Sequence, residues 1–344
     1  MTAAEFLLIL LSSTFAATFA MTFLIKLFAK RAGIMDLPSR RSSHSVPTPR
    51  GGGLAIVAAA SMGFLVLHMF GYLPKPVLLA LMGGLVVAVI GFTDDRRPIS
   101  SAVRLTVHFA AAALAIAVLG GTPPLQLGGA LVRLGLSGAV IGALAMVWTI
   151  NLFNFMDGID GIAASEAIFV LCAAGALSLH SGYPTSLTAA EWLLAAASLG
   201  FLVWNWPRAR IFMGDVGSSY LGYSIAVFAL ASGYDNPVAP LAWLTLGGVF
   251  FVDATVTLMR RILRSERADE PHRTHAYQWM ARRWGSHRRV TLAVTAINVI
   301  WLLPCAWLET TAPRYALWLT GLGMAPLVAI AFWAGAGRRE ADTA

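Results

Sequence analysis

The chain of 344 residues contains little charge. Asp, Glu, Lys and Arg make up only 12% of it, whereas 58% of its residues are hydrophobic and its mean hydropathy is +0.71. A soluble domain carries about twice this share of charged residues. The scarcity of charge therefore excludes a soluble globular protein and a disordered chain. Apolar stretches of about 17 or more residues recur along the whole sequence, which predicts transmembrane helices.

Cysteine is also scarce. Cys172 and Cys305 both lie in apolar runs and form no Cys-x-x-Cys motif, which argues against a disulfide framework or a cysteine metal site. We interpret both as core residues. The N-terminal segment lacks the basic residues of a signal peptide, and its apolar run is too long for one. It is predicted to be a retained first span.

The apolar pattern predicts an all-α fold, in which residues 1–344 form a single domain of a polytopic integral membrane protein. A cytoplasmic loop rich in His and Arg is expected at 260–289. We expect about eleven transmembrane helices, at 5–28, 52–70, 77–93, 103–119, 137–153, 163–180, 188–206, 217–232, 239–259, 290–308 and 314–334.

The basic residues indicate the orientation of these helices. All of the 25 Lys and Arg residues except Lys75, Arg133 and Arg314 fall on one side of the predicted arrangement. Short cytoplasmic loops collect Lys and Arg, so the N-terminus is predicted to be periplasmic and the C-terminus cytoplasmic. The net charge of +8 then belongs to a membrane face that attracts anionic lipid, and we expect no nucleic-acid partner.

An acidic pair, Asp94 and Asp95, ends the third predicted span. Adjacent carboxylates repel each other unless a cation or a shared proton relieves them, so such a pair often binds metal or acts as a base. The alternative is a solvated turn whose charge is neutralised by the following Arg96 and Arg97. The pair alone does not decide between these interpretations.

Two amides and two carboxylates follow the apolar run Gly138–Ile150 of the fifth span at intervals of three residues: Asn151, Asn154, Asp157 and Asp160. Polar groups beside hydrocarbon are costly unless they face water, protein or a ligand. Gly158 and Gly161 predict that the helix ends here and that the backbone approaches a ligand closely. This regular spacing favours a functional site over a plain polar loop.

Three further clusters lie on the same predicted face. Asp215, followed by Gly217 and Ser218, is typical of an Mg²⁺-phosphate site at a helix start, or of an ordinary capped helix. His272 and His275 favour phosphate binding, because no Cys or third His completes a zinc site, although a solvated basic loop is the alternative. Asp36 lies in a Pro- and Gly-rich first loop, and the role of Asp253 in the ninth span stays open. Oxygen ligands of this kind suit Mg²⁺, or Mn²⁺ in its place.

Four motifs carry a resemblance: GFTDDR, NLFNFMDGIDG, FMGDVGSSYLG and HRTHAYQ, in this order. They resemble the polyprenyl-phosphate N-acetylhexosamine-1-phosphate transferases (glycosyltransferase family 4), over nearly the whole chain. The resemblance implies an Mg²⁺-dependent phosphotransferase with a UDP-N-acetylhexosamine donor and undecaprenyl phosphate as acceptor. The lipid phosphate attacks the sugar-linked phosphorus, UMP leaves, and a lipid-linked sugar diphosphate forms.

The family's motifs also imply roles for single residues. Asp215 would bind Mg²⁺ with Asn154 close by, and Asp94 and Asp95 would orient or deprotonate the lipid phosphate. The other two acids counted as catalytic, Asp157 and Asp160, would line the nucleotide pocket on the wall that also carries Asn151. Phe212 would stack on uracil, and Asp36 matches an acidic residue of the common-antigen enzyme. The donor's phosphates or sugar would be held by His272, Arg273 and His275.

The sequence His272-Arg273-Thr274-His275 departs from the run of three His in the peptidoglycan branch. Together with eleven spans, it resembles the branch that initiates O-antigen with an N-acetylated deoxyhexosamine. The expected location is the bacterial inner membrane, with the site on the cytoplasmic face and a homodimer left open. The alternatives are a phospho-muramoyl-pentapeptide transferase, a lipid-binding scaffold and an ion-coupled transporter, whose site would lie near the bilayer midplane.

Overall fold

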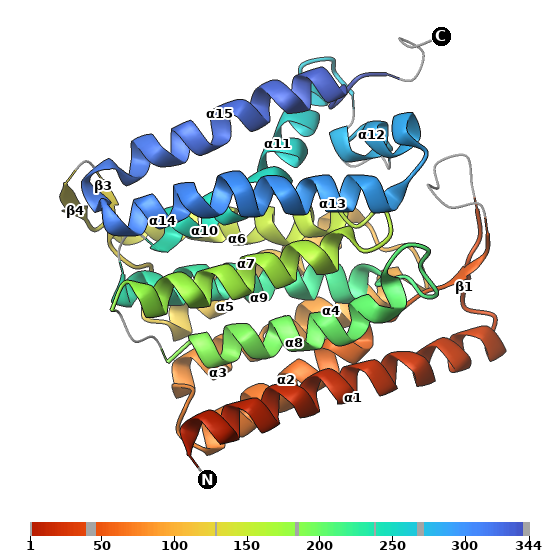
Figure 1. Cartoon of the computed structure of the whole chain (residues 1–344), viewed down its shortest axis with the longest axis horizontal. Helices are drawn as coiled ribbons and strands as arrows, with labels where there is room; N and C mark the ends of the chain where they lie inside the picture. The colour runs from red at the N-terminus through yellow and green to blue at the C-terminus, as the bar shows by residue number, and fades with distance from the viewer. Residues whose placement is uncertain are drawn as a thin grey trace.

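The computed structural model describes residues 2–38, 46–127, 129–182, 186–236, 239–266 and 272–339. Its long helices lie side by side and run between the same two ends of the molecule (Figure 1). The helices of the bundle, including the short segments that continue or break a span, are α1 (Ala3–Arg31), α2 (Gly53–Met69), α3 (Lys75–Met82), α4 (Gly84–Asp94), α5 (Ser101–Val118), α6 (Gly135–Phe155), α7 (Ile162–His180), α8 (Thr188–Asn205), α9 (Asp215–Asp235), α10 (Ala239–Leu246), α11 (Gly248–Ile262), α13 (His287–Ile297), the π-helical η1 (Asn298–Leu302), α14 (Leu303–Thr311), the 3₁₀ turn η2 (Pro313–Tyr315) and α15 (Ala316–Ala334).

Helices occupy all of the predicted spans, which confirms an all-α polytopic membrane protein. Among the described residues, eight helical segments are long and apolar enough to cross a membrane. A ninth, the predicted span 239–259, is a pair of helices, α10 and α11, bent by 73°. The span 77–93 is likewise divided at Gly83 into α3 and α4, which the same criterion joins as one segment. Of the remaining two, α2 is a shorter apolar helix and α8 includes the polar residues Glu191 and Asn205.

The segment 260–289 is not a loop throughout, so that prediction was wrong in part. It contains the helix α12 (Ala276–Trp284), and α13 begins at His287. The first six residues of α12, Ala276–Ala281, are buried, whereas Arg282 and Arg283 near its end are exposed. The abundance of Arg indicated a loop, but the burial of these six residues against the bundle supports a short helix.

The two ends of the bundle differ. One end has β1 (Met35–Asp36), which pairs with β2 (Thr48–Pro49), together with α12 and the end of α15 (Figure 1). The opposite end has the N-terminus and the hairpin of β3 (Leu125–Leu127) and β4 (Ala130–Val132), with Leu125 opposite Val132. Every polar motif singled out above belongs to the α12 end.

Helix α9 lies in the middle of the bundle and is the most buried span. It approaches its neighbours closely because small residues meet there. A Cβ added to Gly53 of α2 would lie 2.4 Å from the Cα of Gly217, and one added to Gly91 of α4 would lie 2.5 Å from the carbonyl oxygen of Asp215. These contacts fix the start of α9 against α2 and α4.

Both cysteines are free, as expected, but only Cys305 is buried. Cys172 is exposed on α7, so its interpretation as a core residue was wrong. An exposed position on a membrane-spanning helix contacts lipid rather than water, and it therefore has the same apolar sequence pattern as a buried one.

Candidate functional site

A cavity of about 940 Å³ opens at the α12 end of the bundle. Its lining includes all the predicted site residues except Asp95 and Arg273. They are Asp36, Asp94, Asn151, Asn154, Asp157, Asp160, Phe212, Asp215, His272 and His275. Residues from five separate segments of the chain thus line one space. Asp95 lies directly behind this wall, whereas the carbonyl of Arg273 accepts a bond from Arg282, and a donor-binding role for Arg273 stays a prediction.

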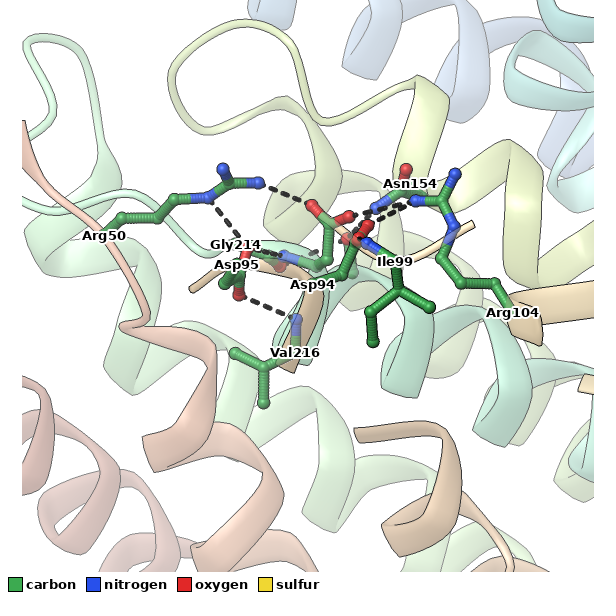
Figure 2. Close-up of polar contacts among 10 residues, drawn as sticks. Arg50, Asp94, Asp95, Ile99, Arg104, Asn154, Gly214 and Val216 are labelled. Atoms are coloured by element: carbon green, nitrogen blue, oxygen red, sulfur yellow. Dashed lines mark hydrogen bonds and ion pairs between the residues drawn. The ribbon is translucent and has the colours of Figure 1, made fainter. Parts of the chain in front are cut away.

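Three carboxylates and two arginines form what we call the acid cluster: Asp94, Asp95, Asp215, Arg50 and Arg104 (Figure 2). Arg50 donates from Nη2 to Asp215 Oδ1 at 2.6 Å, and its Nε lies 2.9 Å from Asp95 Oδ1. Arg104 Nη1 lies 2.5 Å from Asp94 Oδ2 and 3.7 Å from Asp215 Oδ2. Each arginine therefore lies between Asp215 and one of the paired acids. Neither arginine belongs to the site residues predicted from the sequence.

Both carboxylate oxygens of Asp95 also accept hydrogen bonds from the first turn of α9. Its Oδ1 accepts the Asp215 N–H at 2.9 Å and its Oδ2 accepts the Val216 N–H at 3.2 Å. A carboxylate at a helix N-terminus is favourable, because those N–H groups have no partner within the helix. Burial raises the pKa of Asp95 to about 6, although the charge of Arg50 opposes the shift. The contacts of Asp95 are those of a positioning residue.

Backbone pairing brings Arg50 to this cluster from a distant part of the sequence. The Phe212 N–H donates to the Pro49 carbonyl at 2.8 Å, and the Gly52 N–H donates to the Phe212 carbonyl at 2.9 Å. Gly53 continues the pattern with Met213. The segment before α2 is thereby paired with the segment before α9, and Arg50 extends from it toward Asp215.

Asn154, at the end of α6, completes this wall. Its side-chain amide hydrogen-bonds the Asp215 carboxylate and donates to Ser218 Oγ at 3.2 Å. Asn151, one turn earlier, donates to the Val147 carbonyl of its own helix. Asn154 thus lies beside Asp215, and its role near a metal stays a prediction, whereas Asn151 makes no such bond within the described residues.

Asp157 and Asp160 have different surroundings although they share one short loop. Asp160 Oδ2 accepts the Ala209 N–H at 3.1 Å and lies 3.3 Å from His287 Nδ1. The carboxylate of Asp157 has neither a hydrogen bond nor an ion pair in the described part of the chain, and it lines the cavity. Burial raises its pKa well above the ordinary value, with further increases from nearby acids. Asp157 is thus the carboxylate available to a ligand.

Gly158, which follows Asp157, was predicted to let the backbone approach a ligand closely. In the structure it approaches a protein side chain, that of Tyr277. A Cβ there would lie 2.2 Å from the hydroxyl of Tyr277, which donates to the Phe155 carbonyl at 2.9 Å. Tyr277, Gln278 and His287 line the cavity as well. None of the three was assigned a role from the sequence, although Tyr277 and Gln278 belong to the motif HRTHAYQ, because their contacts depend on where α12 and the start of α13 dock.

Another part of the lining, which we call the histidine wall, consists of His272, His275 and the start of α12. Asp253 of α11 lies beneath it. Asp253 Oδ1 accepts the Ala276 N–H at 2.9 Å and lies 3.3 Å from His275 Nδ1, and Oδ2 accepts the Tyr277 N–H at 3.0 Å. The open question about Asp253 is answered: it caps α12 from within α11. The His272 ring stacks on His275 with centroids 4.9 Å apart, and burial lowers its pKa to about 3, so it stays neutral.

The donor set fits Mg²⁺ only in part. Asp215 and Asn154 offer the oxygen ligands that Mg²⁺ prefers. Within the described residues, however, no group of three His, Cys, Asp or Glu side chains is arranged to hold a metal. Mg²⁺ commonly keeps waters and takes substrate phosphate oxygens beside one or two carboxylates. The residues therefore suit a metal that binds together with a phosphate ligand.

Comparison with known proteins is consistent with this geometry. The family model described as "Glycosyl transferase family 4" matches residues 77–233. A probable undecaprenyl-phosphate N-acetylglucosaminyl 1-phosphate transferase of Bacillus subtilis is 28% identical over 86% of this chain and 82% of its own length. The undecaprenyl-phosphate alpha-N-acetylglucosaminyl 1-phosphate transferase of Escherichia coli K12 is 28% identical over 83% of this chain and 79% of its own.

A decaprenyl-phosphate N-acetylglucosaminephosphotransferase of Mycobacterium leprae is also 28% identical, over 80% of this chain and 77% of its own. These relatives span most of both chains, and the matched region contains the acid cluster's Asp94, Asp95 and Asp215 as well as Asn154. By its motifs and these relatives, the chain is similar to members of glycosyl transferase family 4, whose model matches its residues 77–233.

Proposed function

We propose that this protein transfers an N-acetylhexosamine 1-phosphate from a UDP-sugar to undecaprenyl phosphate. An oxygen of the lipid phosphate attacks the sugar-linked phosphorus, the bond from that phosphorus to the bridging oxygen breaks, and UMP leaves. The product is a lipid-linked sugar diphosphate. The reaction would start an O-antigen or another cell-envelope glycan.

The observation that carries this proposal is the two-part character of the cavity. One part is polar and is lined by Asn154, Asp157 and the members of the acid cluster other than Asp95. The other part is apolar and opens between α5 and α6, where Leu105, Phe109, Leu144 and Trp148 line it. Leu105, Phe109 and Leu144 are also among the exposed apolar residues of the bundle. A polyprenyl chain suits this apolar side, which leads to Arg104 and Asp94 where its phosphate would lie.

Each polar group then has a distinct task. Arg104 and Arg50 offset the charge of two phosphate-bearing substrates that must meet. When bound at Asp215 and Asn154, Mg²⁺ would neutralise the donor's diphosphate and polarise its phosphorus. Asp157, whose carboxylate lines the cavity and has no bond among the described residues, takes the proton of the attacking lipid phosphate. Phe212 and the histidine wall hold the uridine and the sugar phosphates.

The test is UMP release by the purified protein with undecaprenyl phosphate, Mg²⁺ and a panel of UDP-N-acetylhexosamines. We expect a labelled lipid diphosphate with at least one donor. If the folded protein forms no product with any donor, the proposed transferase activity is refuted. Turnover in detergent, where no compartments exist, would exclude the transporter. UDP-N-acetylmuramoyl-pentapeptide belongs in the panel, because its use would favour the peptidoglycan-type alternative.

The sidedness of the protein forms part of the proposal. The cavity lies at the end of the bundle that carries most of the basic residues, which favours the cytoplasmic side of a bacterial inner membrane. A soluble UDP-sugar would reach it there. Labelling of single cysteines at the N-terminus and after α15 in intact cells would test this: protection of the N-terminal cysteine would contradict the orientation.

A further inference from the structure

The guanidinium of Arg50 lies where a cation would otherwise neutralise Asp215. We propose that Arg50 competes with the divalent cation for Asp215 and releases it only when a diphosphate ligand arrives, so that metal and donor bind together. This inference rests on the proposed function, since it names how that site takes up its metal and its donor. Arg50 would then bind the diphosphate.

The contacts of Arg50 support the competition. Its Nη2 bonds Asp215 Oδ1 at 2.6 Å, while its Nε bonds Asp95 at 2.9 Å. Asp95 is itself held by the N–H groups of Asp215 and Val216, so one end of the bridge is fixed. The other Asp215 oxygen is 3.7 Å from Arg104, a weaker contact. Release of Arg50 is therefore the change that frees an oxygen of Asp215 for a metal.

A metal alone would gain little by displacing Arg50. Burial would lower the pKa of the guanidinium, but Asp95 and Asp215 raise it above its ordinary value, so Arg50 stays charged. Displaced, the guanidinium would lose an ion-pair partner at a partly buried position, which is costly. A diphosphate changes this balance, because it offers the guanidinium a bidentate anionic partner. Metal and diphosphate should thus increase each other's affinity.

The structure also leaves room for the movement. The Arg50 side chain is 34% exposed and lines the main cavity together with Asp36 and Asp157. It lines a second cavity of about 260 Å³ as well, bounded by α1, α2 and α4. The guanidinium can therefore leave Asp215 without displacing packed side chains.

The test measures Mn²⁺ binding to the full-length protein by electron paramagnetic resonance, without nucleotide and then with UDP. For the wild type we expect weak binding alone and about tenfold tighter binding with UDP. Arg50→Gln should bind Mn²⁺ alone about tenfold more tightly than the wild type, and UDP should add much less. Arg50→Lys, a point charge that cannot make both contacts, should fall between them.

Arg96→Gln is the matched control. It removes the same charge from the same face, but Arg96 lies over the Phe92 ring at 4.3 Å rather than bridging the acids, so it should bind Mn²⁺ like the wild type. Adding Asp215→Asn to Arg50→Gln should abolish the tighter binding.

Wild-type Mn²⁺ affinity in Arg50→Gln, or an equal gain in Arg96→Gln, would overturn the inference. If Arg50→Gln does not fold, unchanged metal affinity and unchanged UDP coupling in Arg50→Lys would overturn it instead. This measurement needs no lipid acceptor and no turnover. It can therefore fail while UMP release still supports the transferase, and it can succeed where transfer fails.

Discussion

The two walls of the cavity hold their acids in different ways. In the acid cluster, Asp94 and Asp215 pair with the side chains of Arg104 and Arg50. In the histidine wall, Asp253 is bonded mainly to backbone N–H groups at the start of α12. An arginine side chain can exchange one anionic partner for another, whereas a helix N-terminus cannot leave its cap without moving the helix. Asp94 and Asp215 can therefore exchange partners, whereas Asp253, like Asp95 at the start of α9, is held in place by a helix N-terminus.

The largest effect on the acid cluster is expected from the substitution Asp215→Asn. The substitution keeps the shape and the Asn154 contact but removes the charge that pairs with both arginines and that the proposed metal would require. We expect kcat to fall by about 10³-fold while the thermal unfolding midpoint changes little. Turnover assays and melting curves on the same preparation check this. Asp235→Asn, an exposed acid at the other end of α9, serves as the control, and retained activity in Asp215→Asn would refute the metal assignment.

A smaller effect on rate is expected from Asp157→Asn, which tests the acid without a partner. If Asp157 accepts the proton, kcat should fall roughly 10²-fold, with a shifted pH-rate profile and little change in stability. The neighbouring Asp160→Asn should do the reverse, because Asp160 bonds Ala209 and His287. Equal loss of stability in both variants would contradict the distinction drawn between them.

The histidine wall should respond in stability more than in rate. Asp253→Ala leaves the N–H groups of Ala276 and Tyr277 without their acceptor, which we expect to cost about 2–3 kcal/mol of unfolding free energy. The KM for the donor should rise because α12 is no longer held in place. Denaturation in detergent and donor titrations measure the two effects. Unchanged stability would show that the cap is dispensable.

The smallest predicted effect concerns pH. Burial lowers the folded-state pKa of His272 to about 3 from an ordinary 6.5. A group of this kind stabilises the fold above its unfolded pKa, and that stabilisation is lost as the pH falls toward the folded value. Below about pH 6.5 the unfolding free energy should drop by at most about 1.4 kcal/mol per pH unit from this residue.

Melting curves of the wild type and His272→Gln at neutral and mildly acidic pH test this. The variant should lose less stability on acidification than the wild type, whereas His180→Gln, at an exposed position on α7, should behave like the wild type. Parallel curves for His272→Gln and the wild type would count against a buried, neutral His272.

Much of the fold and of the site could be predicted from the sequence, because both have local signals. Long apolar runs located the spans, and the Asn and Asp residues at intervals of three located the end of α6 beside the cavity. The arginines could not be selected in this way, since 25 basic residues are present and only pairing between the segments at Pro49 and Phe212 brings Arg50 to Asp215. Asp253 and α12 stayed ambiguous for the same reason: a cap is recognised only once the capped helix is in place.

The contact between Gly91 and the carbonyl of Asp215 has a consequence for how this protein can change over evolution or by design. Backbone meets backbone there, so no side chain can adjust to absorb a substitution, and any added atom would move the carboxylate itself. The chemistry is thus tied to a narrow set of sequences. In the turn before α12, by contrast, His272 and Thr274 have partly exposed side chains, which can be replaced without contact between two backbones. A search for variants that accept new sugars has the better prospect around His272 and Thr274, with the glycines at the start of α9 left unaltered.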